Sequence, residues 1–518
     1  MLFMENRLHT SILGGDVLNP RKIRMVVGRT AGCLPCGYLI VRAQARREIN
    51  IRLNNGRLEN IATSSENGIG IQAFTEKGAC GFASVNRISD AEAVHTAQKA
   101  MELAEENENT GCELNREIFG APKIFSEIPN KAVYGFDSFT PEELAELAGG
   151  IHRQLREKGS EKSEISWQTN FRLIEDFWCI GRSDGTLVSF FIPRAVLSHQ
   201  GTVKEGGQAQ SFSVNSSGVD AGVLLDERSS GALLHKTIDK ARFVQKVCTA
   251  PLLPVGSYPL LIDYGLAKGL AHEAFGHAVE SDLMEESILG EVGKLKTGLV
   301  IARPDVDIID GPLEGDWAYQ PYSANGLFRE TVHVVQNGVL KQGLGDIFSA
   351  AKAGMLVTGA GRSEYFGSVA LPRMTNIRLV TATHIPIPTS DGLTEEISRL
   401  RRGLQDAGLL GEGFHILLLG YRGGQVNTRT GDFVFQCDGA VNLADSKLPV
   451  YRPGIFSGKI LSVLDSVKLS LGEARYDAIG TCGKAGQMVP SSGGGSGYIL
   501  LDKNENVKLG GDTVEQPA

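Results

Sequence analysis

The sequence predicts an α+β fold made of several domains. At 518 residues the chain exceeds what one ordinary hydrophobic core accommodates, so two to four domains are expected. Glycine occurs 63 times, often between β-branched runs, which favours many strands and tight turns. Apolar residues at helical spacing recur between these strands. Together these observations indicate separate helical and strand-rich regions.

The first domain is expected at residues 37–125. EINIRL, the turn at Asn55-Gly56 and LENIAT predict a β-hairpin, because Asn-Gly suits the tight turn that joins two strands. GIGIQAF and GFASVN predict a second hairpin around Glu76-Lys77-Gly78. A helix follows, since Ser89 and Glu92 have the spacing of a capping box.

The rest of the chain divides near residue 250. A middle α+β domain, 126–250, opens with a helix capped by Thr140 before Pro141 and contains three alternating strands. The last domain, 251–518, is expected to be β-rich, with one helix early in it. The run Ser491 to Gly497 is rich in glycine and serine and reads as a loop before the last strand.

The composition argues against nucleic-acid binding, a membrane span and a disulfide framework. The net charge is −8 and no long Lys/Arg run occurs, so nucleic-acid binding lacks its usual electrostatic signature. No apolar stretch long enough to span a membrane is found. Eight cysteines are scattered along the chain, which fits a reducing cytoplasm better than a disulfide framework. A cytoplasmic protein that binds neither membrane nor nucleic acid is therefore expected.

The segment His272-Glu-Ala-Phe-Gly-His277 carries the first chemical signal. In zinc proteases with the pattern His-Glu-x-x-His the histidines are four residues apart and share one helix face. Here they are five apart, which separates them by roughly 140° on a regular α-helix. Either the pair is coincidental, or a π-bulge widens one turn and brings the imidazoles together. Gly276 is flexible enough to allow such a turn.

A metal site would need a third ligand, because catalytic zinc usually has three protein ligands and a water. Glu280 lies three residues after His277 and is either a ligand or an acceptor that orients an imidazole. Cys482 lies in a glycine-rich loop, where Lys484 would favour a thiolate. A cysteine in such a place is also commonly a small buried hydrophobic residue.

Several motifs together resemble the TldD/PmbA family of metallopeptidases, in particular its metal-bearing TldD branch. The resemblance covers about residue 40 to the C-terminus. It rests on ordered motifs across more than 200 residues: His272 to Asp282, Asn337-Gly-Val-Leu340, Arg373-Met-Thr-Asn376, Gly431-Asp-Phe433 and Cys482-Gly-Lys-Ala-Gly-Gln487.

This resemblance implies a Zn²⁺ ion held by His272, His277 and Cys482, with Glu273 as the general base. It also implies a homo- or heterodimer with a PmbA-like partner, and cleavage of small or unfolded peptides. Glu273 would take the proton of the attacking water and pass it to the leaving amine.

Other positions lie outside this pattern or have an open role. Family members often carry an acidic Asp-Asp-Glu-Gly stretch where this chain has Tyr322-Ser-Ala-Asn-Gly326, so Ser323-Ala324-Asn325 bears on substrate preference. Arg373 and Asn376 either bind the substrate backbone or satisfy turns. Residues 1–36 lie outside the resemblance, and the basic stretch Arg21 to Arg29 shows no clear pattern. Cys33 and Cys36 form a single Cys-x-x-Cys, which is more typical of a surface turn than of a zinc or redox motif.

Two alternatives to a zinc peptidase stay open. The chain could be a non-catalytic, peptide-binding subunit of the same assembly, although its ligands and glutamate are intact. It could also be a metal-dependent hydrolase of a non-peptide bond, using the same residues.

Overall fold

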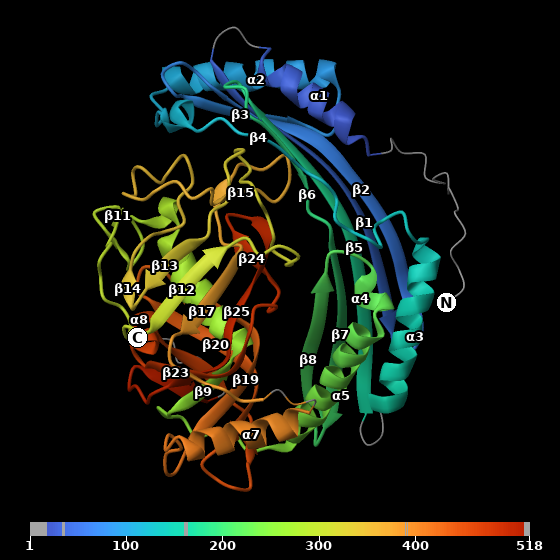
Figure 1. The fold of residues 1–518 in the computed structure, drawn as a ribbon, viewed down its shortest axis with the longest axis vertical. Coiled ribbons are helices and arrows are strands. Elements are labelled where there is room, and N and C mark those ends of the chain that lie inside the picture. Colours follow the sequence, from blue (N-terminus) through green and yellow to red (C-terminus); the bar gives the residue numbers. More distant parts are fainter. Residues whose placement is uncertain (1–17, 34–36, 160–163, 389, 391, 512–518) are drawn as a thin grey trace.

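The N-terminal half is built on one eight-stranded sheet of long strands, which curves along one side of the molecule (Figure 1). The computed structural model describes residues 18–33, 37–159, 164–388, 390 and 392–511. The sheet order is β3-β2-β1-β5-β6-β4, with β7 between β5 and β8. Its strands are β1 (Tyr38–Asn54), β2 (Arg57–Phe74), β3 (Cys80–Val85), β4 (Phe125–Ile128), β5 (Glu164–Arg182), β6 (Leu187–Phe191), β7 (Arg194–Glu205) and β8 (Gln208–Gly218).

Five helices accompany this sheet, four of them long enough to cover its convex side. They are α1 (Pro20–Ala31), α2 (Asp90–Asn109), α3 (Pro141–Gly159), α4 (Gly222–Leu225) and α5 (Glu227–Thr249). The expected boundary near residue 125 falls inside the sheet, because β4 pairs in parallel with β6. The expected boundary near residue 250 falls directly after α5.

Local sequence explains several of these elements. The Asn55-Gly56 turn joins β1 and β2 with both residues at positive φ, which confirms the first hairpin. Ser89 Oγ accepts a hydrogen bond from the Glu92 amide and confirms the cap of α2. Thr140 caps α3 in the same way, accepting from the Glu143 amide.

Helix α1 was not predictable from its run of basic residues. Asn19 caps it, Pro20 occupies its first turn, and the apolar side chains fall on one face. Ile23, Val26 and Val27 are buried against the sheet, while the basic residues alternate with them. The apolar residues of this helix are few and lie among basic residues, so their helical spacing was not recognised in the sequence.

The C-terminal half contains a fourteen-stranded mixed sheet with much shorter strands. Its main order is β14-β13-β12-β17-β25-β9-β19-β20-β22-β26. These strands are β9 (Leu260–Asp263), β12 (Val306–Gly311), β13 (Val332–Gln336), β14 (Val339–Leu340), β17 (Asn376–Thr381), β19 (Ile416–Asn427), β20 (Asp432–Asn442), β22 (Ile455–Lys459), β25 (Gln487–Leu501) and β26 (Val507–Gly510).

Further short strands extend this sheet or form two-stranded ribbons, and two helices pack beside it. The strands are β18 (His384–Ile385), β21 (Val450–Tyr451), β23 (Val467–Arg475) and β24 (Gly480–Lys484), with the ribbons β10 (Gly290–Glu291) and β11 (Lys294–Leu295), and β15 (Gly361–Arg362) and β16 (Leu371–Pro372). The helices are α7 (Leu393–Asp406) and α8 (Ile460–Asp465).

The prediction of a loop at Ser491 to Gly497 is wrong. These residues belong to β25, which lies between β17 and β9 in the middle of the sheet. A side chain at Gly493 would lie 1.9 Å from the Ile377 carbonyl oxygen, and one at Gly495 would lie 2.1 Å from the Leu379 oxygen. The glycines therefore allow neighbouring backbones to approach closely, and do not form a flexible connection.

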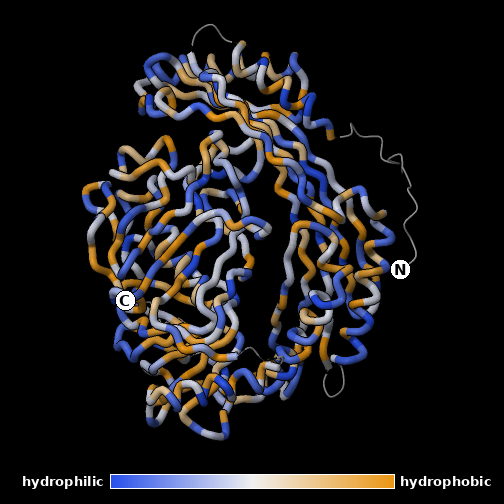
Figure 2. The backbone as a smooth tube through the Cα atoms, in the orientation of Figure 1, coloured by the Kyte–Doolittle hydropathy of each residue, from blue (hydrophilic) through white to orange (hydrophobic). Residues whose placement is uncertain are grey.

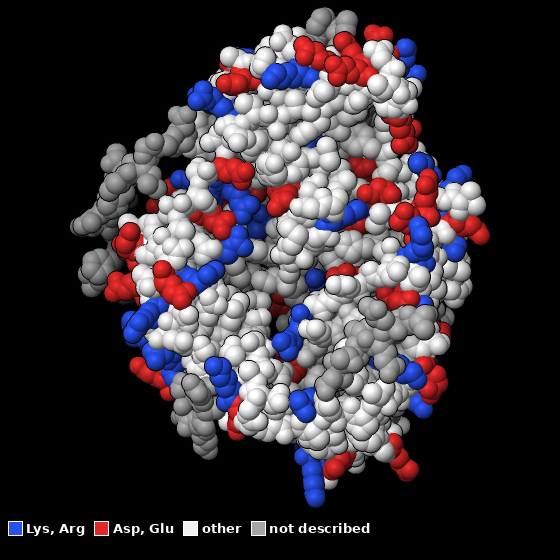
Figure 3. All heavy atoms as spheres, turned by 180° about the vertical axis from the view of Figure 1, so that it is seen from behind, with Lys and Arg blue, Asp and Glu red and all other residues white. Residues whose placement is uncertain are grey.

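The two halves meet through buried side chains beside β24. Arg194 on β7 donates to the carbonyl oxygens of Trp317 and Tyr319. The Trp317 indole in turn donates to the Gly480 carbonyl at 3.2 Å, at the start of β24. Figure 2 shows hydrophobic stretches along the strands of both halves, and Figure 3 shows acidic and basic side chains interspersed over one face. Among the described helices, none is long and apolar enough to cross a membrane.

Candidate metal centre

The His-Glu segment forms a widened helical turn. Helix α6 (Tyr264–Gly269) continues into a π-helical turn at Leu270–Gly276, followed by a 3₁₀ turn at His277–Val279. This confirms the π-bulge expected from the five-residue spacing. Gly276 has a second reason to be glycine, because a Cβ there would lie 1.8 Å from the Met374 sulfur.

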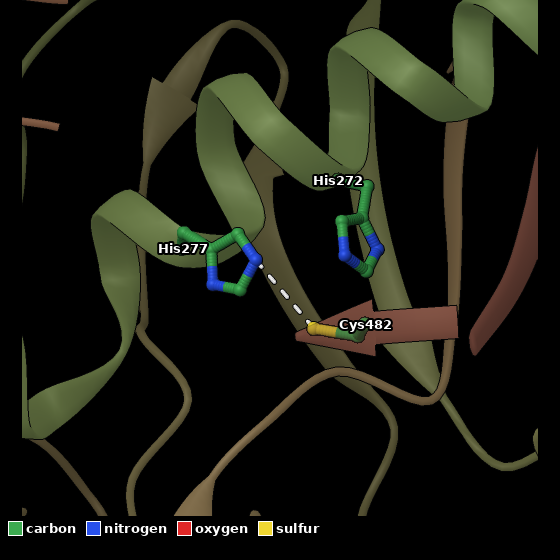
Figure 4. A group of neighbouring side chains, drawn as sticks. All are labelled: His272, His277 and Cys482. Carbon is green, nitrogen blue, oxygen red and sulfur yellow. Dashed lines mark hydrogen bonds between the residues drawn. The ribbon is translucent and has the colours of Figure 1, made fainter. Parts of the chain in front are cut away.

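Three side chains converge below this turn (Figure 4). One donor atom from each of His272, His277 and Cys482 lies within 4.8 Å of the others. His272 and Cys482 are almost fully buried, and the two imidazole centres are 5.1 Å apart. Cys482 Sγ lies 3.5 Å from His277 Nε2. The structure thus brings together, from a helical turn and from β24, the three residues that the family resemblance implied as ligands.

Glu280 orients His277 and does not join the three donors. Its carboxylate accepts a hydrogen bond from His277 Nδ1 at 3.0 Å, which directs Nε2 towards Cys482. Lys484 donates to the same carboxylate oxygen at 2.8 Å and to Asp282 at 2.6 Å. Lys484 therefore ties the strand that carries Cys482 to the turn after His277. The Lys484 ammonium contacts these carboxylates and not the Cys482 thiol.

The protonation of the cluster is asymmetric. Burial and the charge of Lys268 hold the pKa of His272 well below its usual value, so this imidazole is neutral. Burial also opposes charge on His277, but the Glu280 carboxylate and the bond to Cys482 raise its pKa well above the usual value. Burial acts to raise the pKa of Cys482, yet the hydrogen bond and charge of His277 outweigh it and lower that pKa. The Cys482 thiol therefore loses its proton more readily than an ordinary cysteine thiol does.

These residues fit a zinc ion. Zinc–nitrogen and zinc–sulfur bonds of usual length in a tetrahedral site place the two donors about 3.6 Å apart, close to the 3.5 Å between Cys482 and His277. Nδ1 of His272 is buried and has no hydrogen-bond partner among the described residues. Thiolate and imidazole are donors that zinc prefers. Binding would release the proton held between His277 and Cys482.

Glu273 lies beside this cluster, where His277 and Lys268 from its own helical segment and Tyr421 from β19 act on its carboxyl group. Burial raises the pKa of its carboxyl above the usual value, while the charges of His277 and Lys268 and a hydrogen bond from Tyr421 oppose that rise. A carboxylate held in such a partly buried place can accept and return a proton.

Family models match two parts of the chain. Residues 255–504 match the PmbA/TldA metallopeptidase C-terminal domain, and residues 40–104 match PmbA/TldA metallopeptidase domain 1. Together the two matches span more than half of the chain. The chain belongs to the TldD/PmbA metallopeptidase family.

Individual relatives agree with this membership. A metalloprotease of Methanocaldococcus jannaschii is 27% identical over 464 residues, which cover 88% of this chain and 94% of the relative. A zinc metalloprotease TldD homolog of Saccharolobus solfataricus is 27% identical over 261 residues, 49% of this chain and 52% of the relative. The crystal structure of TldE from Thermococcus kodakarensis has the same fold, with a TM-score of 0.69 at 14% identity, covering 95% of this chain and all of that one.

Arg373 and Asn376 make buried contacts within the chain. Arg373 donates to the Cys482 carbonyl oxygen and, at 3.5 Å, to that of Gln487, so it holds both strands of the β24–β25 hairpin. Asn376 donates to the Tyr476 carbonyl at 3.0 Å and to Ser492 Oγ at 3.1 Å. Both side chains are fully buried. These contacts position the metal-site hairpin.

The segment Tyr322 to Gly326, which replaces the acidic stretch, lies between the two halves. The Tyr322 ring packs 5.7 Å from that of Phe190 on β6. Asn325 is buried, with its amide 3.4 Å from Asp346. Of the Cys-x-x-Cys pair, Cys33 is exposed and free, whereas Cys36 lies outside the described residues.

Three residues near the site were missed in the sequence. Lys268 precedes His272 by one helical turn, and that spacing could have identified it. Arg362 donates to the Pro490 carbonyl at 2.8 Å, and Tyr421 reaches Glu273 from β19. Both come from segments without a local signal, and only the folded sheet brings them to the helix.

Proposed function

We propose that this chain is a zinc-dependent peptidase that cleaves small or unfolded peptides. His272, His277 and Cys482 would hold the metal and Glu273 would act as general base. One observation carries the proposal: two imidazoles and a thiol converge because the helix widens by one residue beside an intact glutamate. The metalloprotease names of the relatives, one of them a zinc metalloprotease, support the same chemistry.

A zinc ion in this position would polarise the scissile carbonyl and lower the pKa of water at the site. Glu273 takes a proton as water adds to the carbonyl carbon: a C–O bond forms and the carbonyl π pair moves to oxygen. When the C–N bond breaks, Glu273 returns the proton to the leaving amine. Glu280 and Lys484 keep His277 Nε2 aimed at Cys482 while this occurs.

A dimer is part of the proposal. The resemblance to the TldD branch implies a PmbA-like partner or a second copy of this chain, and the fold shared with TldE is compatible with either. Light scattering of the purified chain, alone and after co-expression with a PmbA-like protein, distinguishes the two. We also place the protein in the cytoplasm, because every described cysteine is free.

The test is the Glu273→Ala variant, with the exposed Glu291→Ala as control. Removal of the base should lower peptide turnover by about 10³-fold while zinc remains stoichiometric, and the control should behave as wild type. Full turnover in Glu273→Ala would remove the proposed mechanism. A panel of peptides, esters and cyclic amides tests the bond type. Absence of turnover with any partner, together with substoichiometric zinc, would favour a non-catalytic peptide-binding subunit instead.

A further inference from the structure

Lys268 is a buried cation whose hydrogen-bonding capacity is mostly unused. Only 6% of its surface is exposed. An ammonium has three donors, and the one hydrogen bond found for it among the described residues goes to Ser491 Oγ at 3.3 Å. No described carboxylate forms an ion pair with it. A buried charge left in this state destabilises the fold unless a partner supplies compensation.

The other buried cations around the cluster have carbonyl or carboxylate oxygens as hydrogen-bond acceptors. Arg362 donates to Gln320 at 2.9 Å and to the Pro490 carbonyl, and Arg373 donates to the carbonyls of the β24–β25 hairpin. Lys484 pairs with two carboxylates. Of these four cations, Lys268 alone has neither a carbonyl nor a carboxylate as acceptor among the described residues.

Lys268 lies on the same helical segment as His272 and Glu273, the proposed ligand and the proposed base. It precedes His272 by four residues and Glu273 by five, which places it about one turn below both. Burial lowers the pKa of the Lys268 ammonium, and the charges of Glu273 and Cys482 oppose that lowering. A Cβ at Gly480, two residues before Cys482, would lie 3.2 Å from its Nζ, so the glycine leaves room for the ammonium.

An anionic oxygen of the substrate would complete this arrangement. In peptide hydrolysis the scissile carbonyl oxygen becomes negative when water adds to the carbon, and a preorganised donor stabilises that charge. Glu273 is the proposed base, and Cys482 is a proposed ligand of the metal that would polarise this carbonyl. We propose that Lys268 Nζ donates a hydrogen bond to the scissile carbonyl oxygen as it becomes negative, which makes Lys268 a catalytic residue. This rests on the proposed peptidase function.

The experiment compares Lys268→Met and Lys268→Gln, which remove the charge, with Lys268→Arg, which keeps it. The exposed Lys508→Met is the matched control. Zinc content is measured for each. Steady-state kinetics use one peptide as the free acid and as the C-terminal amide. Calorimetry measures the affinity for a phosphinate peptide, whose tetrahedral anion resembles the proposed transition state.

Loss of the charge should lower kcat by about 100-fold or more on both peptides, with KM changed by less than about threefold and zinc still stoichiometric. Affinity for the phosphinate should fall by a similar factor, with partial recovery in Lys268→Arg. Unchanged kcat and phosphinate affinity would overturn the proposal. A rise in KM confined to the free-acid peptide would also overturn it, because Lys268 would then bind the substrate's terminal carboxylate.

The two proposals fail in distinguishable ways. A wild-type protein that turns over no peptide removes the peptidase function, yet calorimetry still decides whether Lys268 binds the anion. Conversely, a Glu273-dependent peptidase that is indifferent to the charge at residue 268 keeps its function and loses only this inference.

Discussion

Among the described residues, two pairs of histidines lie close together, one pair in each half, and they have very different surroundings. In the N-terminal sheet, Thr169 Oγ1 lies between His152 Nδ1 at 2.8 Å and His199 Nδ1 at 2.9 Å. The Gly56 amide donates to the other nitrogen of His152 at 2.9 Å. No thiol or carboxylate contacts this pair among the described residues. Burial lowers the pKa of His152 to about 4 and that of His199 to about 3.

The second pair has a thiol on one side and a carboxylate on the other. Cys482 lies beside His277 Nε2, and Glu280 holds His277 Nδ1. The pKa of His277 is accordingly raised by the Glu280 charge, whereas that of His272 is lowered by burial. The difference teaches that two buried imidazoles alone do not indicate a metal site. The soft third donor and the orienting carboxylate distinguish the two.

The comparison is tested most strongly by removing one histidine from each pair. His272→Ala should lose zinc and lower peptide turnover by at least about 10³-fold, because three protein ligands are the usual minimum for catalytic zinc. His199→Ala should keep stoichiometric zinc and instead lose about 1–3 kcal/mol of stability, since it removes one of the two imidazoles bonded to the buried Thr169 hydroxyl. Elemental analysis and urea unfolding measure the two effects. Zinc loss in both variants would break the distinction.

A smaller effect is expected at Lys484, which acts through Glu280. Lys484→Met should weaken zinc binding by about 10–100-fold, because contacts to the residues behind the ligands typically contribute that much. Lys484→Arg should recover part of the affinity. The partly buried Lys296→Met, whose ammonium contacts only the Ile288 carbonyl among the described residues, is the control. Competition with a chromogenic chelator gives the constants. Equal zinc affinities for Lys484→Met, Lys484→Arg and Lys296→Met would show that the Lys484 ammonium does not affect zinc binding.

The last effect concerns pH and the first pair. Both folded-state pKa values lie below 6.5, so below that pH the unfolded chain binds protons that the folded chain does not. Stability should therefore fall as pH drops from about 6.5 towards 4, by up to about 1.4 kcal/mol per pH unit for each histidine. Urea midpoints at pH 7 and pH 5 should differ less in His152→Gln/His199→Gln than in wild type. An undiminished difference would assign the pH dependence to other groups.

Much of the local structure could be predicted because its causes are local. The Asn55-Gly56 turn and the caps at Ser89 and Thr140 act within a few residues. The widened turn also follows from spacing, since His272 and His277 could face one ion only if the helix gained a residue. These features need no knowledge of distant partners.

Features created by distant strands could not be predicted in the same way. Gly493 suggests a loop until Ile377 is known to run beside it, and then it marks a central strand. Cys482 is 205 residues from His277, so residue spacing could not join them and only the family resemblance did. Periodicity places Lys268 on the face of His272, but only the packed hairpin shows that its ammonium is enclosed.

The central claim is that Cys482 is a metal ligand, and zinc analysis of two cysteine variants tests it most directly. Cys437 is the matched control, because it is buried in the same core and is not one of the three clustered donors found in the described residues. Purified wild type and Cys437→Ala should each contain about one zinc per chain, and Cys482→Ala should contain almost none. Stoichiometric zinc in Cys482→Ala would contradict the assigned site.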